Sequence, residues 1–358
     1  MKKYFLRTIL IGISAISFFS CDSDDDPDWT EPEVKTTGVY ILNSGNYKGN
    51  DASLTYYDVE NNTVTENVFA NVNKPLILGE LANDMAIYGS KMYIAVTTSN
   101  KIYVTDKKAR LVTNGTITPL NDEMPMEPRC ILTYEGKIYI STQTGYVLRM
   151  DTTTYSYDKV KVGAYPEQMA ISGNNLFVAN SGQYYDNTVS VVNLNTFSET
   201  SKIELPTYNP VAIQTDKSGN IYVLCWDIHM GTSSALYKIN ATTHAITKIG
   251  DDGIGSYILM NGDKLLIMSL DYDANTSNII SYDTTGNTFS GSFVTDGTVI
   301  ETGNSLNIDP VTGNIYVGTA VYGRKHQMLI FSPDGKLITK FNTGGYYPMG
   351  AYFLSEIK

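Results

Sequence analysis

Residues 85–95 read MAIYGSKMYIA: a short apolar strand, a turn with glycine, and a second apolar strand centred on Tyr93. Six further copies of this phrase, some of them shorter, are centred on Tyr40, Tyr139, Phe177, Tyr222, Leu266 and Tyr316. The seven central residues are separated by 53, 46, 38, 45, 44 and 50 positions. A repeat of about 45 residues is typical of one blade of a β-propeller.

Each copy continues in the same way, with a variable loop and a third strand that ends near Asp or Asn, as in 102–106 (IYVTD) and 147–151 (VLRMD). A Thr-rich fourth segment follows, and helical periodicity is essentially absent outside the first 20 residues. Residues 37–358 span 322 positions, which gives seven units of 46. The first copy lacks its opening strand, and the segment 348–353 (PMGAYF) near the end of the chain has no central strand after it. We therefore predict an all-β fold, a seven-bladed β-propeller of four-stranded antiparallel blades, whose ring is closed by the C-terminal strand so that no free sheet edges remain.

The N-terminal segment has the features of an export signal. Three basic residues precede an apolar run at 8–19, which is too short to span a bilayer. The run ends in Phe18-Phe19-Ser20-Cys21, which resembles a lipobox and implies cleavage before Cys21 and acylation of that residue. We therefore predict a lipoprotein signal peptide at 1–20, a lipidated acidic tether at 21–36 and the propeller at 37–358.

The tether is strongly acidic, with seven carboxylates between residues 22 and 33, and such a run cannot bury a core. An acidic run directly after a lipidated cysteine resembles the surface-export signal of some Gram-negative lipoproteins; a plain solvated linker is the alternative. We expect a lipid-anchored protein of the outer membrane, exposed at the cell surface and touching the membrane through its lipid only.

Composition narrows the possible partners. The net charge is −11, and it becomes −14 without Lys2, Lys3 and Arg7, which argues against nucleic acid or an anionic membrane surface. Tyrosine is the outlier, with 27 residues against 11 Phe and 2 Trp. Tyrosine combines a broad apolar face with a hydrogen-bonding tip, so it suits both sheets and wet binding surfaces.

The loops of a propeller are the natural place for function, because the strands are buried between blades. The loops that lead into each innermost strand and those that join the second and third strands emerge on the same face, and here they are rich in aromatic and amide side chains. Such a surface suits a large neutral ligand with many hydrogen-bonding groups. The predicted ligand-binding residues are Asn43, Asn46, Tyr47, Arg129, Tyr165, Asn180, Gln183, Tyr184, Tyr185, Tyr208, Trp226, Asp227, Tyr257, Tyr272, Tyr322 and Tyr347.

Catalytic motifs are missing from the sequence: it has no G-x-S-x-G elbow, no P-loop and no H-E-x-x-H. Three Cys and three His leave little material for zinc, haem or iron–sulfur sites. We expect a binding protein without catalytic residue, metal or cofactor. One enzymatic alternative stays open: a metal-dependent lactonase or lyase in which Glu167, Asn209 and Asn304 approach the ring axis.

Several stretches of the sequence also resemble those of a known family. Residues 41–47 (ILNSGNY) with 52–58 (ASLTYYD) resemble the opening of the YncE-like surface propellers of gut bacteria, and 165–167 (YPE), 176–182 (LFVANSG) and the stretch 209–226 are similar to the same group. Within that group the BtuG-type lipoproteins capture cobalamin and pass it to a BtuB-like TonB-dependent transporter. The resemblance implies this fold and function for residues 38–358.

The resemblance agrees with the loop chemistry, since cobalamin is bulky, carries amides around its rim and has largely apolar faces. The leading hypothesis is a surface protein that binds cobalamin or related corrinoids and delivers them to that transporter. The alternative is a surface propeller that binds a glycan or a peptide as an interaction module.

Overall fold

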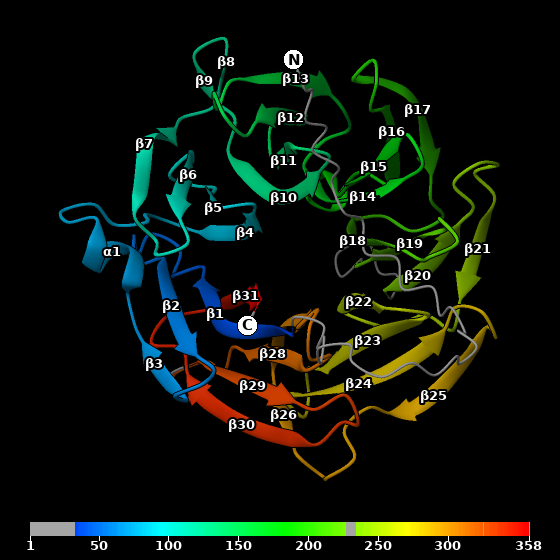
Figure 1. The fold of residues 1–358 in the computed structure, drawn as a ribbon. Helices are drawn as coiled ribbons and strands as arrows, with labels where there is room; N and C mark the ends of the chain where they lie inside the picture. The colour runs from blue at the N-terminus through cyan, green and yellow to red at the C-terminus, as the bar shows by residue number, and fades with distance from the viewer. Residues whose placement is uncertain (1–32, 227–233, 325, 358) are drawn as a thin grey trace, which may run out of the picture.

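The computed structural model describes residues 33–226, 234–324 and 326–357. Across these residues the chain forms a ring of seven four-stranded antiparallel blades (Figure 1). The predicted fold class is confirmed. We number the blades 1 to 7 along the chain, beginning with the blade that contains Tyr40.

Each blade has four positions, counted from the axis outwards. The first strands of blades 1 to 7 are β31 (Pro348–Ile357), β4 (Ala82–Tyr88), β10 (Pro128–Tyr134), β14 (Pro166–Ser172), β18 (Pro210–Thr215), β22 (Tyr257–Asn261) and β27 (Gly303–Ile308). The second strands are β1 (Val34–Asn43), β5 (Lys91–Val96), β11 (Lys137–Thr142), β15 (Asn175–Asn180), β19 (Ile221–Cys225), β23 (Lys264–Asp271) and β28 (Ile315–Thr319). The third strands are β2 (Ser53–Asp58), β6 (Lys101–Asp106), β12 (Tyr146–Asp151), β16 (Thr188–Asn193), β20 (Ala235–Ile239), β24 (Thr276–Asp283) and β29 (Gln327–Phe331). The fourth strands are β3 (Thr63–Thr65), β7 (Leu111–Ile117), β13 (Tyr157–Lys161), β17 (Ser198–Glu204), β21 (Ile246–Ile249), β25 (Thr288–Ser292) and β30 (Leu337–Asn342).

A few short elements lie outside this scheme. They are the helix α1 (Val68–Val72), the hairpin of β8 (Leu120–Asn121) and β9 (Met124–Pro125), the strand β26 (Ile300–Glu301), which pairs with β24, and the 3₁₀ turn η1 (Gly182–Tyr184). Within the described residues, no helix is long and apolar enough to cross a membrane.

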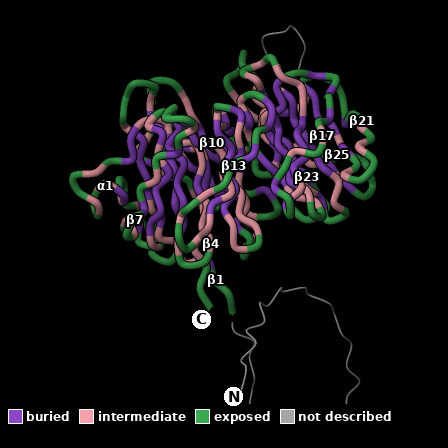
Figure 2. The backbone as a smooth tube through the Cα atoms, turned by 90° about the horizontal axis from the view of Figure 1, so that it is seen from above, coloured by how far each residue is buried: buried purple, intermediate pink, exposed green. Residues whose placement is uncertain are grey.

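The hydrophobic core lies between the blades. Each of the seven clusters of buried apolar side chains found in the described residues joins two neighbouring blades; Tyr93 of blade 2, for example, packs with Ile138 of blade 3. Figure 2 shows the buried backbone inside the ring and the exposed backbone at its two ends. The seven central residues of the sequence repeat are all buried, with at most 4% of their surface exposed. The repeat was visible in the sequence because each second strand is covered on both faces.

The ring closes as predicted. The C-terminal strand β31 pairs with β1, with Val39 opposite Phe353 and Tyr40 opposite Tyr352. The Phe353 ring also meets Tyr316 of blade 7 edge to face at a centroid distance of 5.0 Å. Since β1 begins at residue 34, where it pairs with residue 357, it starts three residues before the predicted propeller boundary at 37.

The acidic or amide residue at the end of a third strand builds the turn that follows it. Asp151 Oδ1 accepts the backbone N–H groups of Thr153 and Thr154, both at 2.9 Å. Asn193, Asn240 and Asp283 accept equivalent pairs of N–H groups. Such side-chain turns are why Asp and Asn recur at this point of the sequence.

We call the loops leading into the first strands the inner loops, and those joining second and third strands the middle loops. Backbone hydrogen bonds tie the two sets together, for example from Ser181 N–H to the Tyr165 carbonyl at 3.1 Å and from Trp226 N–H to the Asn209 carbonyl at 2.9 Å. Both sets therefore lie at one end of the ring, the loop face. The strand β1 begins and β31 ends at the other end, the N-terminal face, from which both project in Figure 2 and onto which Figure 1 looks.

Candidate functional site

The backbone repeats one device at the start of every innermost strand. A residue one or two positions before the strand has a positive φ; in the seven blades these residues are Leu81, Glu127, Tyr165, Asn209, Gly255, Thr302 and Tyr347. In six blades its carbonyl accepts a hydrogen bond from a middle-loop N–H, and in the same six the following strand opens with a register shift. A bulge of this kind re-aims the side chains that follow it. The residues two positions later line the ring axis: Asn83, Arg129, Glu167, Val211, Tyr257, Asn304 and Met349.

These seven side chains surround the axial cavity, which has a volume of about 280 Å³. Asp84, Cys130, Trp226 and Tyr352 also line it. Two of its charged groups are paired with each other: Arg129 Nε lies 2.5 Å from Glu167 Oε2, and Ser181 Oγ donates to Glu167 Oε1 at 3.2 Å. The pair gives the cavity wall two opposite charges that largely cancel.

Asp84 joins three blades on the cavity wall. The Tyr352 hydroxyl of blade 1 donates to its Oδ1 at 2.7 Å, and the Ile131 N–H of blade 3 donates to its Oδ2 at 2.7 Å. Burial raises the pKa of Asp84 to about 6, although these hydrogen bonds oppose the rise. A carboxyl group whose oxygens accept from two neighbouring blades acts here as a cross-link of the ring.

The loop-face cavity adjoins the axial cavity and is larger, about 800 Å³. The two share Arg129, Glu167, Val211 and Trp226. Blades 3, 4 and 5 supply its lining, which consists of Arg129, Gln143, Tyr165, Glu167, Ser181, Gln183, Tyr184, Tyr185, Asn209, Val211 and Trp226. Six of the sequence-predicted binding residues therefore meet in one cavity: Arg129, Tyr165, Gln183, Tyr184, Tyr185 and Trp226.

The middle loop of blade 4 presents its side chains from a strained backbone. Gln183 and Tyr184 have φ values of 50° and 84°. Asp186 holds the loop, because its Oδ1 accepts the Thr188 N–H at 2.9 Å and its Oδ2 accepts the Ala164 N–H at 3.2 Å. Strain of this kind persists only where the surroundings fix it, and it is frequent at ligand sites.

One further predicted tyrosine, Tyr257, lines the axial cavity, and a second, Tyr272, interacts with the cavity residue Trp226. Burial raises the pKa of Tyr272, and a side-chain hydrogen bond with Trp226 opposes the rise. Tyr257 lines the axial cavity, and burial raises its pKa to about 12, with Tyr272 as a second cause. Both hydroxyls stay protonated at neutral pH, so they present a donor and an acceptor to a ligand.

Two predicted residues do not reach the loop face. Asn43 and Asn180 are fully buried at the ends of second strands. The Asn180 amide donates to Thr188 Oγ1 and Ser190 Oγ, at 3.0 and 2.9 Å, and Asn43 donates to Ser53 and Thr55 in the same way. Their amide nitrogens bind the neighbouring third strand, so both side chains lie within the sheet and not on the surface of the loop face.

The remaining predicted residues lie on the loop face outside the cavities. Asn46 holds its own loop by donating to Asp51 Oδ2 at 2.8 Å. The others, Tyr47, Tyr208, Tyr322 and Tyr347, expose their rings. Among the described residues, all the tyrosines with large exposed side chains lie in inner or middle loops: Tyr47, Tyr185, Tyr208, Tyr272, Tyr322, Tyr346 and Tyr347. Asp227 and Cys21 lie outside the described residues.

The three residues named for the metal-enzyme alternative do not all line one cavity. Glu167 lines both cavities, whereas Asn304 lines only the axial cavity and Asn209 only the loop-face cavity. Asn304 Nδ2 donates to the Pro348 carbonyl at 3.1 Å, and Glu167 is paired with Arg129. The described part of the chain contains no group of three or more His, Cys, Asp or Glu side chains placed to hold a metal ion.

Sequence reasoning missed the axial residues Asn83, Asp84, Val211, Met349 and Tyr352. Aligning the repeats on the first strands provides the signal, since Asn83, Val211 and Met349 each stand second in their strand. The residue types alone gave no signal, because valine and methionine at these positions are equally typical of the hydrophobic core.

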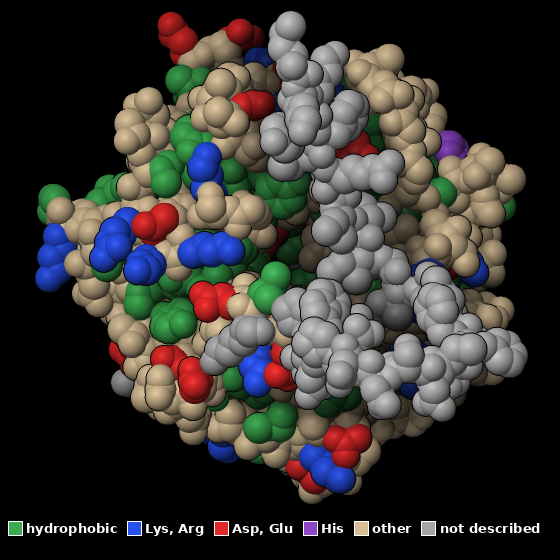
Figure 3. Space-filling model, in the orientation of Figure 1, with side chains coloured by type: hydrophobic (Ala, Val, Ile, Leu, Met, Phe, Trp, Pro, Cys, Tyr) green, Lys and Arg blue, Asp and Glu red, His purple; other side chains and the backbone are tan. Residues whose placement is uncertain are grey.

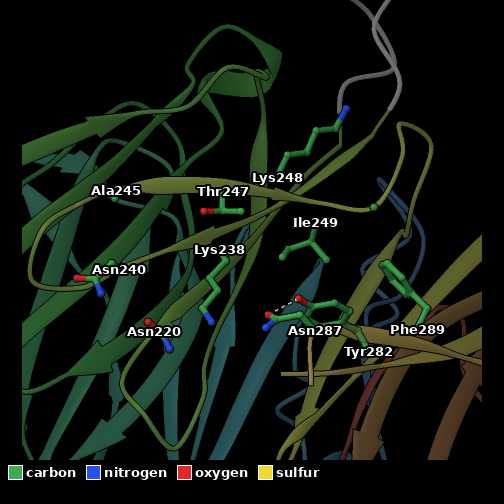
Figure 4. Close-up of a pocket in the computed structure, with 11 residues that line it drawn as sticks. Asn220, Lys238, Asn240, Ala245, Thr247, Lys248, Ile249, Tyr282, Asn287 and Phe289 are labelled. Atoms are coloured by element: carbon green, nitrogen blue, oxygen red, sulfur yellow. Dashed lines mark hydrogen bonds between the residues drawn. The ribbon is translucent and has the colours of Figure 1, made fainter. Parts of the chain in front are cut away.

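A third hollow lies on the side of the ring between blades 5 and 6, with a volume of about 640 Å³. Figure 4 shows the amides of Asn220, Asn240 and Asn287, the Lys238 chain and the ring of Phe289 around it. This side groove is separate from the two cavities of the loop face, with which it shares no lining residue.

Comparison with known proteins places the chain in a family. Residues 37–354 match the family described as "Domain of unknown function (DUF5074)". The chain belongs to this family. The match spans the described propeller almost from end to end, so the DUF5074 domain and the ring of seven blades are the same unit. No curated protein matches the sequence.

Solved structures of the same fold are distant in sequence. Hydrazine synthase of Kuenenia stuttgartiensis is 15% identical, with a TM-score of 0.61 over 76% of this chain and 92% of that one. A protein from Lactobacillus plantarum is 14% identical, with a TM-score of 0.64 over 89% and 100%. The dihydro-heme d1 dehydrogenase NirN in complex with DHE is 12% identical, with a TM-score of 0.58 over 91% and 77%. At these identities the likeness concerns the fold alone, and the BtuG-type resemblance stays a prediction.

Proposed function

We propose that this protein binds one large, neutral, amide-rich ligand of the corrinoid class on its loop face, as a binding protein without a catalytic step. We further propose that a lipid on Cys21 holds it at the outer membrane, where it passes the ligand to a BtuB-like TonB-dependent transporter. The observation that carries the binding proposal is the loop-face cavity, in which aromatic and amide side chains of three blades surround about 800 Å³.

The lining suits such a ligand in two ways. Tyr184, Tyr185 and Trp226 offer ring faces for stacking, and Gln143 and Gln183 offer amides that pair with ligand amides. The paired charges of the cavity wall also favour a neutral guest, since a charged one would compete with an ion pair that is already formed. The cavity is of the usual size for a ligand site, so a corrinoid would keep part of its surface exposed, as transfer to a transporter requires.

The test measures ligand-induced stabilisation of the chain from residue 22 onwards. Cyanocobalamin at 1,000 times its Kd should add about 4 kcal/mol of stability and raise the melting temperature accordingly. Trp226→Ala and Tyr184→Ala should shrink the rise. Tyr322→Ala is the matched control, because that ring is 96% exposed on the same face but lines neither cavity. If cyanocobalamin does not raise the melting temperature of the unaltered protein, the proposal is wrong.

The side groove supports the second candidate, a glycan- or peptide-binding module. Its three amides and the Phe289 ring, which is 43% exposed, resemble the mixture that binds sugar rings. Glycan-array binding that Phe289→Ala removes and Trp226→Ala leaves intact, together with no response to cyanocobalamin, would favour this candidate over the first.

A further inference from the structure

A fourth hollow lies on the N-terminal face, where blades 1 and 2 meet, with a volume of about 400 Å³. We call it the N-terminal groove. One side is apolar and is formed by Tyr56 of β2, Val68 and Val72 of α1, and Leu354 of β31. Val72 leaves 44% of its surface exposed, so the described residues do not cover the apolar side of the groove completely.

The opposite side of the groove is basic. Lys107 and Lys108 line it from the turn between β6 and β7, and Glu356 is the one acid among the lining residues the structure describes. Neither lysine takes part in any ion pair found among the described residues. Figure 3, which looks onto this face, shows Lys and Arg side chains gathered beside hydrophobic ones over the region of α1 and β6. A basic edge of this kind is an unusual feature on a chain with a net charge of −11.

The chain enters the propeller beside this groove. Thr36 of β1 pairs with Ser355 of β31, and Thr37 and Ser355 both line the groove. Residues 22–33 carry seven carboxylates, and Trp29 is their single large apolar side chain. Trp29 precedes Val34 by five residues, a span of at most roughly 18 Å in extended chain, so the groove lies within its reach.

We propose that the tether folds back onto the propeller, with Trp29 in the apolar side of the N-terminal groove and its acidic neighbours Asp28 and Glu31 paired with Lys107 and Lys108. An indole is large enough to cover the exposed part of Val72, and the charges of the two partners are complementary. Docking fixes the N-terminal face towards the anchor end of the chain and the loop face away from it. This inference does not depend on which ligand the loop face binds.

The experiment uses tryptophan fluorescence of the chain from residue 22 onwards. The chain has only two tryptophans, so Trp226→Phe leaves Trp29 as the single reporter. Its emission should lie at shorter wavelength than that of a peptide of residues 22–36, and acrylamide should quench it several-fold less. Val72→Asp, at a half-exposed position, should restore peptide-like emission. Lys107→Glu combined with Lys108→Glu should do the same, and salt should weaken the docking of the unaltered groove.

Ile338→Asp is the matched control, because Ile338 is 56% exposed on blade 7 and should leave the emission unchanged. A circular dichroism spectrum and melting curve for each variant separate loss of docking from loss of fold. Peptide-like emission in the folded reporter chain would overturn the proposal, and so would shielded emission that the groove substitutions leave unchanged. A shielding that disappears on dilution would also overturn it, since the groove would then bind the tether of a second copy.

Discussion

The ion pair on the wall of the two cavities offers the sharpest test of the site. Replacing Arg129 by Met and Glu167 by Gln, singly and together, gives a double-mutant cycle for the pair. Their side chains are 29% and 12% exposed. Breaking a fully buried pair costs about 3–5 kcal/mol and an exposed pair contributes about 0–1 kcal/mol. For partners buried to this extent we expect a coupling of about 2 kcal/mol.

The assay is urea unfolding of the four proteins, with the coupling taken from the extrapolated free energies of unfolding. Arg129→Met should also raise the pKa of Asp84 further, because the guanidinium is one of the groups that hold it down. A coupling below about 0.5 kcal/mol, the value of a solvated surface pair, would refute the view that Arg129 and Glu167 form a desolvated pair beneath the loop-face cavity.

Three further outcomes follow from the structure. Gly163→Ala should destabilise the fold by about 1–3 kcal/mol in thermal unfolding, because its Cβ would lie 2.4 Å from Asn180 Cγ, whereas Gly291→Ala, with open space around it, should be near neutral. The free energy of unfolding of the unaltered protein minus that of Asp84→Asn should fall by roughly 2.5 kcal/mol between pH 4 and 7. The raised folded-state pKa favours the folded state at low pH, and that advantage is lost as pH rises through about 6. A difference that does not change with pH would contradict the buried carboxylate. Ending the chain at residue 347 removes the strand that closes the ring, so proteolysis should show loss of the compact fold; a resistant, fully folded product would mean that β1 needs no inner partner.

The sequence could predict the blades because burial of the second strands is uniform. Every second strand lies between two other blades, so it must be apolar and must recur at the blade period. The start of the first strands carried no such signal. Leu81, Glu127 and Thr302 adopt positive φ there, although none of these residue types favours it. Tertiary hydrogen bonds from the middle loops to their carbonyls impose the conformation, and no local pattern records such bonds.

The sequence predicted which loops share one face of the ring, but not how deeply each of their residues is buried. Counting loops brought Tyr184, Tyr185 and Trp226 into one cavity, since loops at one end of a ring converge whatever their sequence. The same counting misplaced Asn43 and Asn180, which stand last in their strands and still belong to the sheet. Their burial follows from glycines in neighbouring inner loops, whose lack of a side chain lets the backbone lie on the amide. Close approach of this kind depends on pairs of residues far apart in the sequence.

The axial residues make a nearly symmetric ring chemically asymmetric. The backbone places one side chain per blade at the axis, so only residue identity distinguishes the blades there. Blades 2, 3 and 4 contribute Asn83 and the Arg129–Glu167 pair, whereas blades 5 and 6 contribute Val211 and Tyr257. The loop-face cavity spans blades 3 to 5 and therefore crosses the boundary between the polar and the apolar side. If the proposed amide-rich ligand binds there, it meets hydrogen-bonding groups on one flank and the apolar side chain of Val211 on the other, and we expect the distribution of its amides to select its orientation.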